Sequence, residues 1–177
     1  LAIDNKLTLN VDETLIIENA GLVEWPVPML GKIDPDFMQV PSEVLISAMR
    51  KHQKYFYLTD KAGKLAPNFI VISNIQPQDD GKSIVTGNER VLRARLADAK
   101  FFWDQDCNVS IVQHAAKLKN MIYHAKLGSL HDKMLNLQTL ALKLRQYVAG
   151  STDEHLSKAA LFCKADLCSE TVGEFPD

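Results

Sequence analysis

The side chains in this sequence best suited to chemistry are cations, and they gather in two short stretches. The first, residues 87–106, reads GNERVLRARLADAKFFWDQD and places Arg90, Arg93 and Lys100 on one face of an expected helix. Arg95 lies elsewhere on this helix, three residues before an aspartate that can pair with it. Such a face can contact phosphates, or it can be a solvated surface whose cations pair with neighbouring acids.

The second basic stretch closes another expected helix and consists of Arg50, Lys51, His52 and Lys54. Cations suit the negative end of a helix dipole, which is a purely structural reason for their presence. The functional interpretation is a short basic patch near RNA or a substrate. His52 alone is typical of a hydrogen-bonded surface histidine rather than of a catalytic base.

Metal-dependent hydrolysis is the other chemistry to consider, because His131 is followed by Asp132. A metal site needs further ligands that converge, and the spacing of His114, His124 and His155 defines no common geometry. No glycine-rich phosphate loop, serine elbow or HExxH motif is present in the sequence. We therefore predict no catalytic residue and no metal site in this chain.

The first half of the chain is expected to mix strands and helices. We predict a strand at 7–9, a helix from Asp12 to residue 19, and an extended edge strand around the prolines of 24–31, with Trp25 as a core anchor. Ser42 is expected to cap the helix that carries the second basic stretch.

Two further strands, 55–59 and 68–74, are joined by a glycine-containing turn and predict a β-hairpin. Ile84 and Val85 are expected to form a short extended link into the helix of 87–106. Apolar residues of this helix repeat with helical period and predict its buried face: Leu92, Leu96, Ala99 and Trp103.

The second half is expected to be wholly helical. One helix is predicted from Asn108 or Ser110 through Ile122, a second begins at Ser129 and closes at Gly150, and a third follows. The change from mixed to helical patterning predicts an α+β module at 1–107 and a helical module at 108–177.

Composition narrows the class of protein. The chain has 177 residues, 46% of them hydrophobic, with a net charge of −2, so nucleic-acid binding would depend on a local patch. No apolar run is long enough to span a membrane, and no signal peptide is evident. Three cysteines are too few for a disulfide framework, Cys163 and Cys168 are expected to be core thiols, and a cytoplasmic location follows. The two ends suggest a fragment of a longer protein.

Several stretches together resemble the β-subunit of bacterial glycyl-tRNA synthetase, the type with separate α and β chains. These stretches follow the family's order along most of the chain: 22–26 (LVEWP), 49–56 (MRKHQKYF), 67–75 (PNFIVISNI), 87–102, 126–130 (KLGSL), 164–167 and 172–176. The combination is specific to the family, whereas each stretch alone is weak.

The resemblance implies that glycine is activated with ATP and Mg²⁺ and attached to its tRNA, with the reaction at the α-subunit. The β-subunit would recognise tRNA and scaffold the α-subunit. Its implied architecture is a module like the B3/B4 editing module of phenylalanyl-tRNA synthetase, followed by a helical HD-like domain that is cut short here. Together with this resemblance, the two basic stretches supply our candidate tRNA contacts: Arg90, Arg93, Arg95, Lys100, Arg50, Lys51, His52 and Lys54.

HD domains often bind a metal through a histidine–aspartate dyad. If Asp166 takes the place of that aspartate, Ala165 stands where the histidine should be, which argues against metal hydrolysis. Two other hypotheses stay open: a hydrolase, either a metal phosphohydrolase or an editing-type esterase, and a structural module that contacts only the α-subunit.

Overall fold

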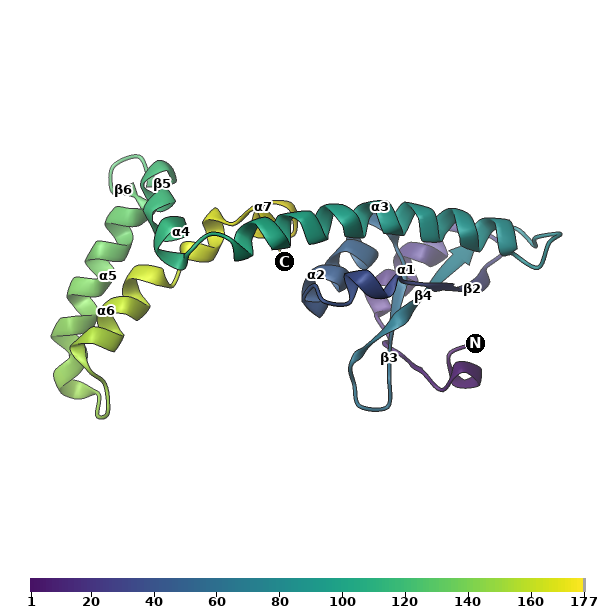
Figure 1. Ribbon diagram of the computed structural model, residues 1–177, viewed down its shortest axis with the longest axis horizontal. Helices are drawn as coiled ribbons and strands as arrows, with labels where there is room; N and C mark the ends of the chain where they lie inside the picture. Colours follow the sequence, from purple (N-terminus) through teal and green to yellow (C-terminus); the bar gives the residue numbers. More distant parts are fainter. Residues whose placement is uncertain (177) are drawn as a thin grey trace. The chain divides into compact units, whose positions relative to one another are not determined.

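The computed structural model describes residues 1–176, and the chain divides into two compact units, Leu1–Phe101 and Phe102–Asp177 (Figure 1). The first unit contains a sheet with helices packed on it, and the second is mostly helical, so the predicted α+β class is confirmed. Helix α3 (Lys82–Cys107) begins in the first unit and ends in the second. Within the described residues, no helix has both the length and the apolar composition needed to cross a membrane.

The first unit is built on a four-stranded antiparallel sheet of order β1-β3-β4-β2. Its strands are β1 (Thr8–Leu9), β2 (Val27–Lys32), β3 (Phe56–Thr59) and β4 (Leu65–Ser73). The predicted hairpin is the pair β3–β4, whose turn is held by Asp60 Oδ1 accepting the N–H groups of Ala62 and Lys64 at 2.8 and 3.0 Å. Strand β2 takes an edge position, as its prolines predict, because proline has no N–H to donate.

One face of the sheet is covered by α1 (Glu13–Leu22). Asp12 caps this helix, as predicted, by accepting the Leu15 N–H at 3.0 Å. Leu15 packs in one core cluster with strand residues Phe56, Leu58, Ala66 and Ile70. A short 3₁₀ turn, η1 (Ile3–Asn5), precedes β1.

The other face of the sheet meets α3. Phe69 neighbours Ile70 in β4 and therefore points to the opposite face. Its ring stacks on Tyr55 with the centroids 4.6 Å apart, and the Tyr55 hydroxyl donates to Asn88 of α3 at 2.5 Å. Burial raises the pKa of Tyr55 to about 12, so this hydroxyl keeps its proton. Figure 1 shows α3 running along the sheet. Leu92, Leu96 and Ala99 of this helix are buried, as the apolar repeat predicts, whereas Trp103 at the end of the repeat is only half-buried.

Strand β2 approaches this face unusually closely at Gly31. A Cβ atom at this position would lie 2.3 Å from Cζ of Phe69. The absence of a side chain at Gly31 therefore lets the Phe69 ring fill the space beside β2, next to the first residues of the following segment. That segment contains the 3₁₀ helix η2 (Pro35–Phe37).

Three expectations for the first unit are wrong: the start of α3, the burial of Trp25 and the cap at Ser42. Helix α3 begins at Lys82, so Ile84 and Val85 are helical rather than an extended link. The reason is Asp79, whose carboxylate accepts the N–H groups of Gly81 and Ser83 at 3.1 and 2.8 Å and so starts the helix several residues early.

Trp25 is 66% exposed and is no core anchor. The backbone at this point is held instead by Asn74 Oδ1, which accepts the N–H groups of Glu24 and Trp25 at 2.8 and 2.9 Å, and this leaves the indole outside. Ser42 does not cap either, because it is already the first residue of α2 (Ser42–Ser47). This helix continues as the π-helical turn η3 (Ala48–His52).

The second unit begins with α4 (Ile111–Lys117), capped by Ser110, and the 3₁₀ turn η4 (Leu118–Asn120). The expectation of an all-helical module is wrong at the next point: β5 (Ile122–His124) and β6 (Gly128–Ser129) form a two-stranded sheet. Ile122 is thus in a strand and 82% exposed. The helical segment ends with η4 at Asn120. Gly128, the first residue of β6, has φ +89°, a conformation that glycine adopts without strain after the turn that joins the two strands.

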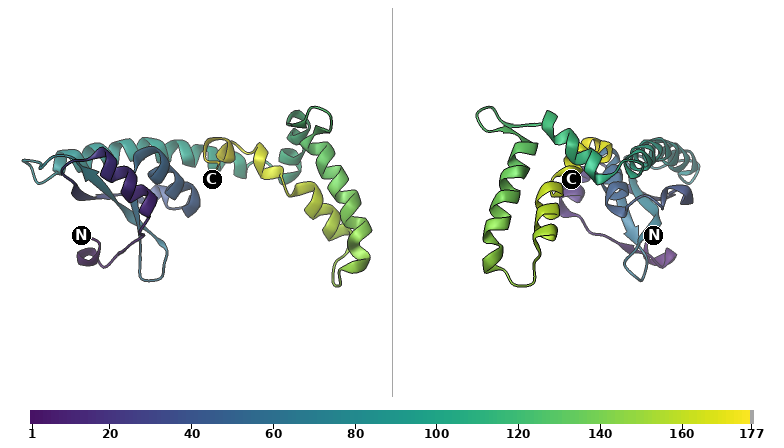
Figure 2. Two further views of the ribbon diagram at one scale, coloured as in Figure 1. Left: turned by 180° about the vertical axis from the view of Figure 1, so that it is seen from behind. Right: turned by 60° about the vertical axis from the view of Figure 1, so that its left-hand side comes forward.

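The remaining elements of the second unit are helical. They are α5 (Leu130–Leu144), η5 (Arg145–Tyr147), α6 (Asp153–Phe162), η6 (Ala165–Cys168) and α7 (Glu170–Glu174). Ser129 opens α5 with a capping box, as predicted. Gly150 does not close this helix, because α5 ends at Leu144 and the chain continues as η5, so Gly150 at φ +82° lies in the loop before α6. Helices α5 and α6 lie side by side (Figure 2). The core of the second unit is small, and its buried residues come from α4, η4, α5 and η6: Ala115, Leu118, Met134 and Ala165.

Candidate functional site

A groove lies within the first unit between α3 and the segment that follows β2. Its volume is about 690 Å³. Its buried apolar lining residues are Ile33, Phe37, Leu92 and Leu96. Its charged lining residues are Lys32, Asp34, Glu89, Arg90 and Arg93. The structure therefore combines two residues predicted from the first basic stretch with an apolar surface and with charged groups from another part of the chain.

Arg93 is engaged by an acid of the groove. Its Nη2 lies 2.7 Å from Oδ2 of Asp34, while the guanidinium side chain is 64% exposed. Asp34 is held in place because its other oxygen accepts the Asp36 N–H at 3.0 Å and caps η2. Arg93 is thus both an ion-pair partner and a cation that solvent can reach.

Arg90 stands in a different situation. Its neighbour Glu89 accepts the backbone N–H of Lys32 at 2.8 Å, which brings the end of β2 against α3. No hydrogen bond or ion pair involves the Arg90 guanidinium or the Lys32 ammonium among residues 1–176. Both carboxylates of the groove are therefore occupied by groups of the protein, and two of its three cations have no such partner.

The second basic stretch is linked to α1. Arg50 pairs with Asp12, and Lys54 Nζ lies 2.7 Å from Glu18 Oε2. The hydrogen bonds from Arg50 and from the Leu15 amide lower the pKa of Asp12, so this acid is charged at neutral pH. These two cations help to fix α1 on the sheet, which is a structural role.

His52 is brought to α3, where its Nδ1 lies 3.0 Å from Nη2 of Arg95. His52 of the second basic stretch thus contacts Arg95 of the first, a contact that the sequence alone did not predict. Lys51 lies exposed on η3, and Lys100 is half-buried on α3. The eight candidate cations therefore occupy at least two places on the first unit: the groove, and the junction of α1, η3 and α3.

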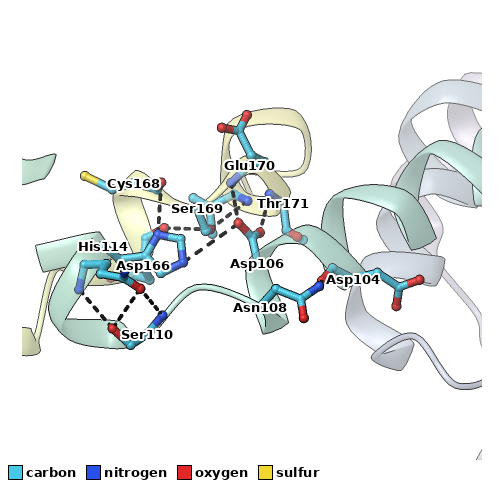
Figure 3. A network of polar contacts seen from close by, with 12 residues as sticks. Asp104, Asp106, Asn108, Ser110, His114, Asp166, Cys168, Ser169, Glu170 and Thr171 are labelled. Carbon is cyan, nitrogen blue, oxygen red and sulfur yellow. Dashed lines mark hydrogen bonds and ion pairs between the residues drawn. The ribbon is translucent and has the colours of Figure 1, made fainter.

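A separate polar network lies inside the second unit (Figure 3). Asp106 accepts the N–H groups of Glu170 and Thr171 at 2.9 and 2.8 Å, and its Oδ1 lies 4.0 Å from Nε2 of His114. The other ring nitrogen of His114 lies 3.3 Å from the Cys168 carbonyl oxygen, to which it can donate. Burial acts to raise the pKa of Asp106, but the hydrogen bonds from Thr171 and the Glu170 amide, with the charge of His114, lower it overall.

This network joins the end of α3 to the start of α7 through two backbone N–H groups that Asp106 accepts. It holds the chain together across 64 residues, so its chemistry is structural. The sequence did not predict this role of Asp106. A single aspartate near the end of a helix is only weak evidence for such a contact.

The residues considered for metal binding lie apart. Asp132 accepts the N–H and hydroxyl of Ser129 at 2.8 and 2.7 Å as part of the α5 cap, and these hydrogen bonds lower its pKa. Asp166 lies exposed in η6 beside the buried Ala165. Within residues 1–176 no three or more histidine, cysteine or acidic side chains form a group that could hold a metal ion.

Neither cysteine expected in the core is fully buried. Cys163 is exposed and Cys168 is half-buried, which corrects the expectation. Helix α6 ends at Phe162, so Cys163 follows the helix, with its thiol sulfur 3.5 Å from the Met134 sulfur at the edge of the core. Burial still raises the pKa of the Cys168 thiol, with nearby charges as smaller influences.

Three charged groove residues were not expected from the sequence: Lys32, Asp34, and Glu89 in its role as an acceptor. A signal existed for Asp34, because an aspartate before a proline is a typical cap of a helical turn. Lys32 carried none, since only the pairing of β2 with β4 brings it to α3.

Comparison with known proteins gives the family. A family model described as "Glycyl-tRNA synthetase beta subunit" matches residues 1–177, the whole chain. The chain belongs to the glycyl-tRNA synthetase β-subunit family.

Individual relatives agree with this membership. A "Glycine--tRNA ligase beta subunit" of Phenylobacterium zucineum (strain HLK1) is 45% identical over 100% of this chain and 27% of its own length. Proteins of the same name from Rhodospirillum centenum and Geobacter sulfurreducens are 47% and 48% identical, over 97% and 94% of this chain and 24% of their own lengths. The chain thus spans about a quarter of the length of these members of the glycyl-tRNA synthetase β-subunit family.

Proposed function

We propose that this chain is part of the β-subunit of a glycine–tRNA ligase and supports the ATP-dependent attachment of glycine to its tRNA. Its role is to contact the tRNA and to scaffold the catalytic α-subunit, in the cytoplasm. ATP and Mg²⁺ act at the α-subunit, so this chain needs no cofactor of its own. Membership of the family, at 45% identity over the whole chain, supports this proposal.

We further propose that the first unit is part of a B3/B4-like module and the second the start of an HD-like domain, with the functional boundary near 107/108. The resemblance of the stretches at 49–56, 67–75 and 164–176 supports this division. The sheet carrying helices on both faces and the paired helices α5 and α6 are compatible with it.

The observation that carries tRNA contact is the groove, in which Arg90 and Lys32 have no side-chain partner among the residues that the structure describes. Phosphate contacts supply most of the affinity of proteins for nucleic acids, and free surface cations are their usual source. The remaining candidates, Arg93, Arg95, Lys100, Arg50, Lys51, His52 and Lys54, stay part of the proposed interface. Arg93, Arg50 and Lys54 are expected to contribute less, because each already pairs with a carboxylate.

Reconstitution of the enzyme tests this proposal. The full β-subunit with Arg90→Gln is combined with the α-subunit, and the rate of tRNA glycylation is measured against the concentrations of tRNA and glycine separately. We expect a raised KM for tRNA, an unchanged KM for glycine, and no glycylation by this chain without the α-subunit. Lys61→Gln, an exposed lysine in the β3–β4 turn, is the matched control. An unchanged KM for tRNA would remove Arg90 from the interface.

A further inference from the structure

We propose that the groove between α3 and β2 binds one unpaired nucleotide of an RNA strand, with its phosphate at Lys32 and Arg90 and its base against the apolar lining. This inference rests on the proposed function, since it assigns part of the tRNA contact to a particular site and a particular RNA structure.

The charge of the groove favours a phosphate. The N–H of Lys32 donates to Glu89, the residue before Arg90, so these two cations lie on neighbouring parts of the lining. Glu89 is occupied by that N–H, and Asp34 is occupied by Arg93 at 2.7 Å. An entering phosphate therefore meets two cations without partners and two acids whose charge is already balanced or hydrogen-bonded.

The apolar lining indicates more than a bare anion. Ile33, Phe37, Leu92 and Leu96 are each at most 7% exposed, yet all four border the groove. A site for a free phosphate needs only donors and positive charge. Buried apolar side chains beside cations suit a ligand with a charged part and a flat, less polar part, and a nucleotide has both.

Polar groups for the edge of a base are also present. Asn68 Nδ2 donates to the Gly31 carbonyl at 3.3 Å, while its Oδ1 accepts no hydrogen bond from the described residues. Thr86 of α3, which carries a hydroxyl, borders the same groove. An acceptor and a hydroxyl at the border of a pocket can bind the exposed edge of an unpaired base.

The volume of the groove selects single-stranded RNA over a duplex. About 690 Å³ lies within the range of small-ligand pockets. The bases of an A-form duplex are stacked inside the helix and cannot enter such a pocket, whereas unpaired bases in loops and at ends can be turned outward. The ligand is thus a nucleotide from a loop, a bulge or an unpaired end.

The test uses the 177-residue chain and three variants. Fluorescence anisotropy measures binding of a short single-stranded oligoribonucleotide and of the duplex that it forms with its complement, across a salt series. Arg90→Gln removes a cation. Thr86→Trp fills the groove from an exposed position on α3 and changes no charge. Lys61→Gln removes a cation outside the groove, and circular dichroism checks that each variant is folded.

We expect the single strand to bind more tightly than the duplex. Arg90→Gln should weaken single-strand binding about tenfold and lower the salt slope by about 0.7, the value for one phosphate contact to a single strand. Thr86→Trp should weaken single-strand binding by at least as much, and Lys61→Gln should have little effect.

The results distinguish a failure of the nucleotide site from a failure of the proposed tRNA contact. If Thr86→Trp has no effect, or if the duplex binds as tightly as the single strand, the nucleotide site is wrong, while a loss in Arg90→Gln still supports tRNA contact. Displacement of the oligoribonucleotide by an equal concentration of inorganic phosphate would also reject the nucleotide site. If Arg90→Gln changes neither oligonucleotide binding nor the KM for tRNA, the proposed contact itself is wrong at this residue.

Discussion

The two units use their carboxylates in opposite ways. In the first unit, Asp34 pairs with an arginine that is 64% exposed, so the pair lies where a ligand can compete for the cation. In the second unit, the Asp106 side chain is 11% exposed and binds two backbone N–H groups of α7. The Asp34–Arg93 pair partly neutralises a charge at the surface. The hydrogen bonds of Asp106 instead hold together two segments of the second unit that are distant in the sequence.

The hydrophobic cores of the two units differ in how many large side chains they bury. The first unit buries large side chains on both faces of a sheet, among them Phe69, Leu58 and Leu96. The second unit buries few, and several leucines of α5 stay exposed, including Leu140 at 52%. Specific polar contacts such as those of Asp106 therefore carry a larger share of the stability of the second unit.

A cavity in the smaller core is expected to have a large effect on stability. Leu118→Ala empties a fully buried site and should lower the free energy of unfolding by about 2–5 kcal/mol. Urea unfolding gives the magnitude, and hydrogen exchange should show lost protection in α4 to α6. Leu58→Ala is the matched variant in the first unit, with lost protection confined to the sheet. Equal loss in both units for either variant would mean that the cores are not separate.

Removal of the Asp106 carboxylate is expected to come next. Asp106→Ala leaves two backbone N–H groups without their acceptor and should cost about 1–3 kcal/mol. Because its pKa is lowered in the folded protein, the carboxylate stabilises fully above its ordinary value of 3.8, and this stabilisation is lost as pH falls through the lower folded pKa.

Urea unfolding at several pH values checks this prediction. The gap in stability between wild type and Asp106→Ala should be constant near neutral pH and should shrink below about pH 4. Asp166→Ala, at an exposed aspartate of the same unit, is the control and should change little. A gap that grows on acidification would contradict the assigned direction of the pKa shift.

Breaking the ion pair between Asp34 and Arg93 in the first unit should change RNA binding more than stability. Asp34→Asn keeps an oxygen to cap η2 but releases Arg93, so stability should fall by only about 0.2–1 kcal/mol. RNA affinity should rise, because the groove loses one negative charge, and the salt dependence of binding should steepen. Anisotropy over a salt series measures both quantities, and an unchanged affinity would show that Arg93 lies outside the interface.

The smallest effect is expected at Trp25. Because its indole is 66% exposed, Trp25→Ala should change the free energy of unfolding by no more than about 0.5 kcal/mol. Phe69→Ala, at a ring with no exposed surface, should cost about 3–5 kcal/mol by comparison. A loss of more than 1 kcal/mol for Trp25→Ala would show that the indole is covered in the protein in solution.

Local signals predicted the parts of the fold that depend on a few neighbouring residues. The Asp12 cap, the Ser129 capping box and the β3–β4 hairpin each require only a cap or turn residue at the right spacing. The apolar repeat of α3 was sufficient to predict its buried face at Leu92 and Leu96.

Features that depend on distant residues were missed. The early start of α3 depends on Asp79, whose role is visible only once Gly81 takes its left-handed conformation. The groove depends on the pairing of β2 with β4, which no local pattern contains. Trp25 was misplaced because its size favours burial, whereas Asn74 holds its backbone with the side chain outside. Of the three groove cations, Arg90 and Arg93 belong to the basic face expected from the sequence, whereas Lys32 was missed. Which of these cations pair with an acid could not be predicted, because their partners lie on other elements.

The contact between Gly31 and Phe69 has a consequence for how this protein can change over evolutionary time. Every codon change at Gly31 that alters the amino acid adds a side chain, and even the smallest would place a carbon 2.3 Å from the Phe69 ring. That ring has no exposed surface and stacks on Tyr55, which in turn binds Asn88 of α3. A mutation at Gly31 would therefore shift the strand that ends in Lys32, and selection for the groove acts on a residue that does not line it.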